Sequence, residues 1–423
     1  MKNPRYLTAK EAALLLGVST LTLYAYVSRG LIRSEDLGAK TRIHRYYYED
    51  VERLLRKKEI YRKPDKAAMY ALNWGRPVLE SSLTLIQNQR LYYRGQDAIQ
   101  LAQTETFERV AALLWTGNMH DAVSFDPPSE AIRMVERARR VSSDTLTLLG
   151  RLIVTLTQMN DLDARAFDLD PAHLAVQGGR MVSAMTYALV AALSNDRIAA
   201  QVAARWCADP AHAAPLIDAA LILCADHELN ASSFAARVAA STGATLYMVV
   251  TAGLATLSGG KHGGATLRTA ALLNDLARDC NVERHTASLF DVRSLLLERL
   301  RRGEHLHGFG HRLYPDGDPR AAQLLKLLAA TFPDSPTLAF GRTVIDVARE
   351  LTDHEPNIDF ALALLGFMLG LPKDAPFALF ALGRSAGWIA HAIEQYSADT
   401  LIRPRARYVG VLPDTPPSDA DDL

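Results

Sequence analysis

One pattern dominates the chain beyond residue 66: Ala and Leu recur at helical spacing along most of its length. Runs of Val, Ile and Tyr that alternate with polar residues are few, and no hairpin signal stands out there. The longest apolar stretches, near 181–193 and 360–371, are shorter than the ~18 residues that a membrane-spanning helix needs. Because 49% of the 423 residues are hydrophobic, the sequence predicts a helical body with a large buried core and no membrane span.

The first 66 residues follow a different pattern. Thr8 and Glu11 have the spacing of a capping box at the start of a helix, and Gly17 is placed to end that helix. Ser19 is a suitable cap for a second helix over 20–29. The inward face of the first helix is expected to consist of Ala12, Leu15 and Leu16.

Two short helices joined by a turn with glycine predict a helix-turn-helix. The segment 32–48 is rich in Arg, Lys and Tyr, which predicts a β-wing. A third helix is expected over 49–59, with Val51, Leu54 and Leu55 facing inward. This order of elements resembles the winged DNA-binding domains of the MerR and excisionase type, and the module is placed at 1–62.

The charges are divided unevenly between the two parts. Residues 1–66 hold 15 Lys and Arg against 8 Asp and Glu, whereas the remainder holds 32 against 39. DNA phosphates would be contacted by five basic residues, Arg29, Arg33, Lys40, Arg42 and Arg45. The recognition helix would present Thr20, Thr22, Tyr24 and Tyr26. The alternative is a module that is retained for protein contacts and no longer binds DNA.

Two histidines in the body stand in unusual surroundings. His227 lies between two carboxylates in Asp226-His-Glu-Leu-Asn, just before an Asn/Ser helix cap. His262 has glycines on both sides in the segment 258–264, which a ligand could approach closely. A structural histidine and a flexible turn are the competing interpretations. The phosphate-binding motif G-x-x-x-x-G-K-[ST] is absent.

A third histidine follows two glycines in the segment 307–320. This is His311, and the segment closes on Asp-Pro-Arg320. His305 and His307 are near enough in sequence to suggest a metal site, but no cysteine or carboxylate completes an obvious ligand set, so no metal is expected.

The last group of polar residues lies near the C-terminus. Asp359 begins an apolar helix, where it is either an N-cap or a partly desolvated carboxylate of the kind that a general base requires. Arg384, Arg403 and Arg405 are either surface charges or forks for substrate carboxylates.

Taken together, these motifs resemble those of the citrate synthase family, which includes the 2-methylcitrate synthases. In chain order they are D-H-E-x-N-x-S-x-F, H-G-G-A, G-F-G-H-R-x-Y…D-P-R-A, N-x-D-F, G-R-x-A-G-W-I-A-H and I-R-P-R-x-x-Y-x-G. The segment 83–94 resembles the start of the same domain, so that the likeness covers roughly 68–412. It implies an all-α fold with a large domain (68–263 and 359–412) and a small domain (264–358).

The resemblance also implies a reaction, the condensation of an acyl-CoA with a 2-oxo acid such as oxaloacetate. Asp359 would remove the C–H proton, His262 would hydrogen-bond the forming enol, and His311 would polarise and protonate the ketone oxygen. The oxo acid would be bound by His227, Asn230, Arg320, Arg384 and one of Arg403 or Arg405. In the family the last of these reaches across a dimer interface, so a homodimer or higher homo-oligomer is implied. Acyl-CoA is then a substrate, and no cofactor is needed.

Three departures from the family pattern leave the acyl group open. Thr266 replaces the usual Asn, Ala361-Leu-Ala replaces Tyr-Ser-Gly, and Pro315 replaces a basic residue. We expect acetyl-CoA as the substrate and citrate as the product, in the first step of the tricarboxylic acid cycle. The alternatives are a 2-methylcitrate synthase that uses propionyl-CoA, and a DNA-binding regulator that senses acyl-CoA or an oxo acid through a degenerate synthase domain. Three cysteines without a C-x-x-C pair fit a reducing cytoplasm.

Overall fold

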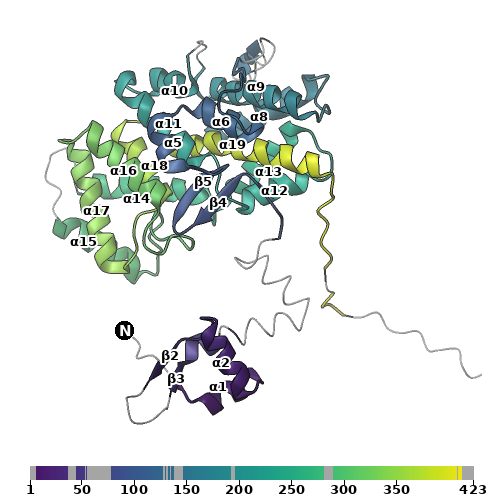
Figure 1. Ribbon diagram of the computed structural model, residues 1–423. Coiled ribbons are helices and arrows are strands. Elements are labelled where there is room, and N and C mark those ends of the chain that lie inside the picture. Colours follow the sequence, from purple (N-terminus) through teal and green to yellow (C-terminus); the bar gives the residue numbers. More distant parts are fainter. Residues whose placement is uncertain are drawn as a thin grey trace, which may run out of the picture. The chain divides into compact units, whose positions relative to one another are not determined.

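The computed structural model describes residues 6–36, 44–52, 54, 78–126, 129, 132–133, 135–137, 146–191, 196–280, 289–406 and 408–411. The chain divides into two compact units, Met1–Ser81 and Ser82–Leu423, which are called here the N-terminal unit and the body (Figure 1). Among the described residues, no single helix is both long and apolar enough to cross a membrane. The pair α1 (Ala9–Leu16) and α2 (Thr20–Ser28) passes that test only when taken together, and the two helices meet at 96°.

The N-terminal unit has the predicted helix-turn-helix. The side chain of Thr8 accepts from the N–H of Glu11, whose carboxylate in turn accepts from the N–H of Thr8, so α1 begins with the expected capping box. Gly17 ends α1 in the left-handed conformation (φ 60°), and Ser19 caps α2. Three short antiparallel strands complete the unit in the order β1-β3-β2. They are β1 (Tyr6–Leu7), β2 (Ser34–Asp36) and β3 (His44–Tyr47).

The core of this unit differs from the prediction at one residue. Ala12, Ala13 and Leu16 are buried, whereas Leu15 is 46% exposed. Residues 12, 13 and 16 share one face of a helix that advances 100° per residue, and this face leaves Leu15 outside. Val51 is buried as expected, and Leu54 packs against the core. The remainder of the predicted third helix, including Leu55, lies outside the described residues.

The body is helical and is organised around one long helix. This helix, α19 (Ala375–Ala398), runs through the middle of the body in Figure 1 and is buried along most of its length. Its neighbours include α11 (Pro210–Cys224), α12 (Ala231–Ala240) and α13 (Leu246–Leu257). The body also contains α5 (Ala98–Thr104), α6 (Phe107–Thr116), α8 (Leu148–Leu162), α9 (Pro171–Val190), α10 (Ile198–Trp206), α14 (Gly264–Asp279), α15 (Leu289–Arg301), α16 (Pro319–Thr331), α17 (Pro336–Thr352) and α18 (Ile358–Met368).

Two glycines bring the end of α11 against α19. A Cβ atom at Gly383 would lie 2.6 Å from the carbonyl oxygen of Leu221, and one at Gly387 would lie 2.4 Å from that of Ala225. The N–H of Gly387 donates to the same Ala225 carbonyl at 2.9 Å. Only residues without a side chain permit this approach, and it fixes the position of the segment that carries His227.

The body contains a small sheet, for which no hairpin signal stood out in the sequence. Residues 84–97 form a three-stranded antiparallel sheet of β4 (Thr84–Gln87), β5 (Arg90–Tyr93) and β6 (Gln96–Asp97). Its first turn places Asn88 and Gln89 at positive φ (52° and 58°), as a type I′ hairpin requires. Glutamine is not a typical residue of such turns, so the usual Asn-Gly signal is missing.

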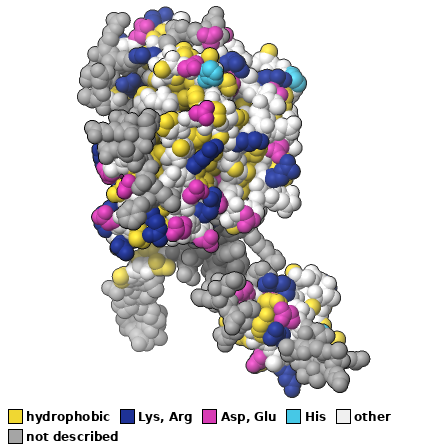
Figure 2. Space-filling view, turned by 90° about the vertical axis from the view of Figure 1, so that its left-hand side faces the viewer, with side chains coloured by type: hydrophobic (Ala, Val, Ile, Leu, Met, Phe, Trp, Pro, Cys, Tyr) yellow, Lys and Arg dark blue, Asp and Glu magenta, His cyan; other side chains and the backbone are white. Residues whose placement is uncertain are grey.

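Helices α14 to α18 form a second cluster of the body. Helix α18 packs between α14 and α16, and α15 packs against α17. An ion pair between Arg293 and Glu350, with 3.0 Å between nitrogen and oxygen, joins α15 to α17 at the surface. On the face shown in Figure 2, basic and acidic side chains are interspersed in this way. The division of the body at 263/264 and 358/359 stays a prediction.

Candidate active site

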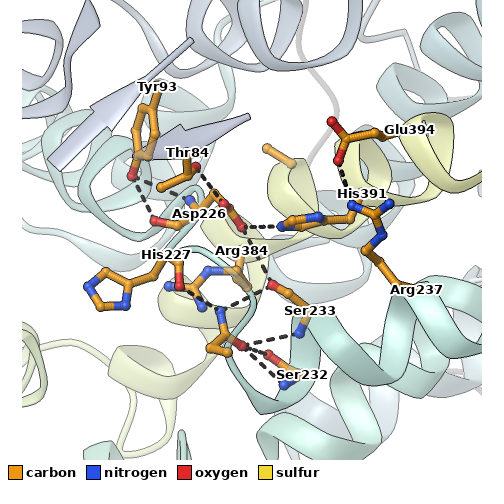
Figure 3. Close-up of polar contacts among 12 residues, drawn as sticks. Thr84, Tyr93, Asp226, His227, Ser232, Ser233, Arg237, Arg384, His391 and Glu394 are labelled. Atoms are coloured by element: carbon orange, nitrogen blue, oxygen red, sulfur yellow. Dashed lines mark hydrogen bonds and ion pairs between the residues drawn. The ribbon is translucent and has the colours of Figure 1, made fainter. Parts of the chain in front are cut away.

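Two adjacent buried residues, Asp226 and His227, follow α11 and begin the site (Figure 3). The carboxylate of Asp226 accepts from the hydroxyl of Thr84 at 2.6 Å and lies 3.3 Å from Nε2 of His391. Burial acts to raise the pKa of Asp226, but His391 and Arg384 hold it below the usual value of an aspartate. Asp226 therefore contributes a buried negative charge beside His391 and Arg384.

His227 belongs to a cluster of three rings. Its Nε2 lies 3.0 Å from the hydroxyl of Tyr314, and its ring centroid is 5.2 Å from that of His311. Burial, together with the positive charges of Arg320 and Arg384, holds the pKa of His227 well below its usual value. The histidine is therefore neutral at physiological pH.

The loop that carries His311 depends on two glycines. Gly308 and Gly310 have φ values of 91° and 75°, a conformation that other residues rarely adopt. The N–H of Leu313 donates to Nδ1 of His311 at 3.2 Å, so the proton of the neutral ring is on Nε2. Burial and the charge of Arg320 lower the pKa of His311 to about 4. The ring is thus a neutral donor through Nε2.

His262 lies between α13 and α14, beside Ser232 of α12. Its Nε2 is 2.8 Å from the hydroxyl oxygen of Ser232, and its ring is edge-on to that of Phe380, with centroids 6.3 Å apart. Burial, with a smaller effect from Arg384, lowers the pKa of His262 to about 4. His262 is therefore also neutral.

Asn230 has a positioning role in this structure. It is the N-cap of α12, and its Oδ1 accepts from the N–H groups of Ser232 and Ser233 at 3.0 and 3.1 Å. The hydroxyl of Ser232 reaches the same oxygen at 2.7 Å, and the amide nitrogen of Asn230 donates to the Ser233 hydroxyl at 3.1 Å. Asn230 thereby fixes the serine that contacts His262.

Asp359 is not an N-cap, which excludes one of its two interpretations. The N-cap of α18 is Asn357, whose side chain accepts from the N–H of Asp359 at 3.0 Å. Asp359 lies in the first turn and accepts a hydrogen bond from the hydroxyl of Thr266. Burial raises the pKa of Asp359 to about 6, against the opposing effect of that hydrogen bond. A carboxylate with this pKa is suited to general-base chemistry near neutral pH.

Two buried arginines face the same region. The guanidinium of Arg320 binds the carboxylate of Asp318 through Nε and Nη2 at 2.9 and 2.8 Å. Arg384 donates from Nε to the carbonyl oxygen of Cys224 at 2.7 Å and stacks over Phe380 at 4.9 Å. Its Nη2 is buried without a hydrogen-bond partner among the described residues. An unpaired buried donor of this kind is costly unless a ligand satisfies it.

The structure gathers most of the predicted site residues and leaves two apart. Arg403 and Arg405 are exposed on the segment after α19, and their side chains form no hydrogen bond or ion pair with any described residue. The residues brought together are His227, Asn230, His262, His311, Arg320, Asp359 and Arg384. The residues that sequence reasoning did not assign are Ser232, Thr266, Tyr314 and Asp318, although each stands inside or beside a motif that was recognised.

Two of the candidate DNA-binding residues form ion pairs with acidic side chains of the N-terminal unit itself. Arg33 is paired with the buried Asp50 at 2.8 Å, and Arg45 with Glu35 at 2.8 Å. Arg29 is exposed, and its side chain has no hydrogen-bond or ion-pair partner among the described residues. Lys40 and Arg42 lie outside the described residues.

Comparison with known proteins accounts for both units. The family model for the citrate synthase C-terminal domain matches residues 71–405. The chain belongs to the citrate synthase family. A second model, for a helix-turn-helix domain, matches residues 6–59.

Individual relatives agree with this assignment. The citrate synthase of Haloferax volcanii is 30% identical over 363 residues, which cover 79% of this chain and 93% of the relative. A 2-methylcitrate synthase of Mycobacterium tuberculosis is 31% identical, and the match covers 78% of this chain and 88% of the relative. The crystal structure of citrate synthase from Thermotoga maritima MSB8 superposes with a TM-score of 0.63 at 27% identity, covering 82% of this chain and 98% of that chain.

Membership in the citrate synthase family defines the reaction class. The chain is an acyltransferase of the type that condenses an acyl-CoA with oxaloacetate. CoA thioesters are substrates of these enzymes, and the reaction needs no cofactor.

Proposed function

We propose that this citrate synthase family member condenses acetyl-CoA with oxaloacetate to give citrate and CoA, as the first step of the tricarboxylic acid cycle in the cytoplasm. The observation that carries the proposal is the surroundings of Asp359. Its carboxylate has a raised pKa and shares the site with two neutral histidines. A base and two uncharged donors are what enolisation of a thioester followed by attack on a ketone requires.

The first half-reaction is assigned to Asp359 and His262. The carboxylate of Asp359 removes a proton from the methyl carbon next to the thioester. When Ser232 donates its hydroxyl proton to Nε2 of His262, the proton of the neutral ring lies on Nδ1. That N–H is then free to donate to the thioester oxygen as negative charge develops there.

The second half-reaction is assigned to His311 and the buried arginines. Nε2–H of His311 donates to the ketone oxygen, polarises it for attack and delivers a proton as the new carbon–carbon bond forms. Water then hydrolyses the thioester of the condensed product, which breaks the carbon–sulfur bond and releases citrate and CoA. Oxaloacetate carries two carboxylates, and the unpaired Nη2 of Arg384 is a ready donor to one of them. Arg320 and His227 complete the binding site for the oxo acid.

We infer a homodimer from the segment that follows α19. It carries Arg403 and Arg405 with no partner among the described residues, and four of its large apolar side chains are exposed: Leu401, Tyr408, Val409 and Val411. A second copy of the chain would cover these side chains and receive one arginine in its own site.

Subunit complementation tests this arrangement. Asp359→Asn and the double variant Arg403→Ala/Arg405→Ala should each be inactive alone. Mixed dimers should regain activity, because one of their two sites then has its own Asp359 and an intact arginine from the partner. Mixtures that stay inactive although light scattering shows dimers would contradict an arginine supplied in trans.

The choice of acetyl-CoA is supported by Phe380. This buried side chain lies against both His262 and Arg384, and its bulk beside the histidine that would bind the thioester favours the smaller acyl group. The alternative, a 2-methylcitrate synthase, is supported by the relative from Mycobacterium tuberculosis. Release of the CoA thiol, measured with oxaloacetate and either acetyl-CoA or propionyl-CoA, decides between them. Faster turnover of propionyl-CoA would favour the 2-methylcitrate synthase over the citrate synthase.

A second candidate function concerns the N-terminal unit, which matches a helix-turn-helix domain model. We propose that it binds DNA, with α2 as the recognition helix and Tyr24, 51% exposed, on its outer face. A gel-shift assay of the full chain with the DNA upstream of its own gene, with and without acetyl-CoA, tests this. No shift at low salt would leave the unit as a protein-contact module.

A further inference from the structure

Thr266 makes a contact unlike that of other threonines in the helices of the body. It is fully buried in the first turn of α14. The hydroxyls of Thr269, Thr251 and Thr256 each donate to the carbonyl oxygen four residues earlier, at 2.8 to 2.9 Å. This is the usual arrangement for a threonine inside a helix. The hydroxyl of Thr266 instead leaves its own helix and donates to Oδ1 of Asp359 on α18.

The two oxygens of Asp359 are therefore not equivalent. Oδ1 is held by Thr266, whereas no described residue donates a hydrogen bond to Oδ2. The main chain at Asp359 is held as well, because its N–H donates to Asn357, whose amide donates to the carbonyl of Gly310 at 3.0 Å. One oxygen is thus anchored on a rigid helix while the other remains available for a proton.

We propose that Thr266 is a positioning residue for proton abstraction, which anchors Oδ1 of Asp359 so that Oδ2 faces the carbon acid. This rests on the assignment of Asp359 as the base under Proposed function. The position is one where the sequence departs from the family pattern, with Thr in place of the usual Asn. The departure then concerns the base, and not the affinity for acyl-CoA.

Three variants test the hydroxyl of Thr266 separately from the size of its side chain. Thr266→Val keeps the shape and removes the donor, Thr266→Ser keeps the donor, and Thr266→Ala removes the donor with less bulk. Loss of a hydrogen bond to a charged group changes an equilibrium or rate constant by about 10- to 100-fold. We expect kcat to fall by about that factor in the Val and Ala variants and to recover in the Ser variant. The KM for oxaloacetate should stay within about twofold of the parent in all three, because binding of the oxo acid is assigned to other residues.

The pH profile supplies a readout that a purely structural role would not change. Because the hydrogen bond from Thr266 stabilises the charged form of Asp359, its removal should move the acidic limb of kcat to higher pH in the Val and Ala variants only. A titration of the Asp359 carboxyl by ¹³C NMR, assigned with Asp359→Asn, should show the same shift without any turnover.

The outcomes separate this inference from the one it rests on. If the parent releases no CoA with either acyl-CoA, the proposed function fails, and an NMR pKa that is unchanged in the variants would overturn the Thr266 contact as well. If the parent is active and the folded Val and Ala variants keep its kcat and pH profile, only the role of Thr266 is wrong. Should the Val variant not fold, the Ala and Ser variants decide by the same two measurements.

Discussion

The hydroxyl oxygen of Ser232 lies 2.8 Å from Nε2 of His262 and 2.7 Å from Oδ1 of Asn230. The serine has one proton and two possible acceptors, so its orientation decides which nitrogen of His262 bears the hydrogen. When the proton points to His262, Nδ1–H of the ring is free for the thioester oxygen. The orientation of Ser232 thus sets the tautomer of the histidine that is proposed to bind the thioester.

Ser232→Ala should therefore lower kcat by about tenfold or more, since His262 loses the group that fixes its tautomer and ring orientation. The KM for oxaloacetate should change little. The CoA-release assay at saturating substrate measures the effect. Ser397→Ala is a matched control, because that exposed serine at the end of α19 only donates to the carbonyl oxygen of Ile393. An unchanged kcat in a folded Ser232→Ala protein would refute the argument.

The pKa of Asp359, raised by burial to about 6, predicts the pH dependence of the reaction. The base acts in its charged form, so kcat/KM for the acyl-CoA should be constant above that pH and fall tenfold per unit below it. Rates measured over a buffer series at acyl-CoA concentrations well below KM would show this single limb. A profile that stays flat down to about pH 4, the ordinary pKa of an aspartate, would rule out Asp359 as the titrating base.

The same pKa predicts a trade-off between activity and stability. A carboxyl whose pKa is raised by folding opposes folding once it is charged, and this cost grows as the pH rises from the unfolded pKa, near 4, to about 6. Asp359→Asn should abolish turnover and also raise the Tm at neutral pH. At about pH 4, where both proteins are uncharged at this position, the difference in Tm should vanish. A lower Tm of the Asn variant at neutral pH would contradict the expectation.

Much of the site could be predicted from the sequence because its motifs confine the residues to short, rigid segments. Gly308 and Gly310 fix the loop of His311, and Gly387 fixes the approach of the segment before His227. The direction of a hydroxyl is a different matter. Whether Thr266 donates within α14 or across to α18 depends on the packing of two helices more than 90 residues apart in sequence, and no local pattern records it.

The N-terminal unit shows the same limit for charge. The net charge of residues 1–66 predicts a basic surface. In the structure, however, Arg33 forms an ion pair with Asp50, and Arg45 forms one with Glu35. These acids come from the strand and helix that the fold places beside them, so a count of charges does not reveal the pairing. The type I′ turn at Asn88 and Gln89 lacks the usual glycine. The side chain of Gln89 is bound to Asp316, which is distant in sequence, and a local pattern does not reveal such a contact.

Gly253 lies against the indole of Trp388, and this contact predicts a stability effect. A Cβ atom at Gly253 would approach Trp388 Cδ2 to 2.6 Å, and the indole is fully buried. Gly253→Ala should therefore destabilise the body by about 1–3 kcal/mol, even though alanine favours a helix more than glycine does. Gly150→Ala is the matched control, because its nearest neighbour would be a side-chain carbon of Leu146 at 3.3 Å. Urea unfolding with equal midpoints for both variants would show that the core absorbs the methyl group.

The basic residues of the N-terminal unit give a final prediction that separates binding from folding. Arg29 has no hydrogen-bond or ion-pair partner among the described residues, whereas Arg33 holds the carboxylate of Asp50, which is 1% exposed. If the unit binds DNA, Arg29→Ala should weaken binding of any duplex and lower the salt slope of binding by about one, with no loss of stability. Arg33→Ala should instead destabilise the unit, because it removes the guanidinium that forms an ion pair with a buried carboxylate. Gel shifts over a salt series, with circular dichroism of the same proteins, measure both effects, and equal salt slopes for Arg29→Ala and the parent would exclude Arg29 from the DNA interface.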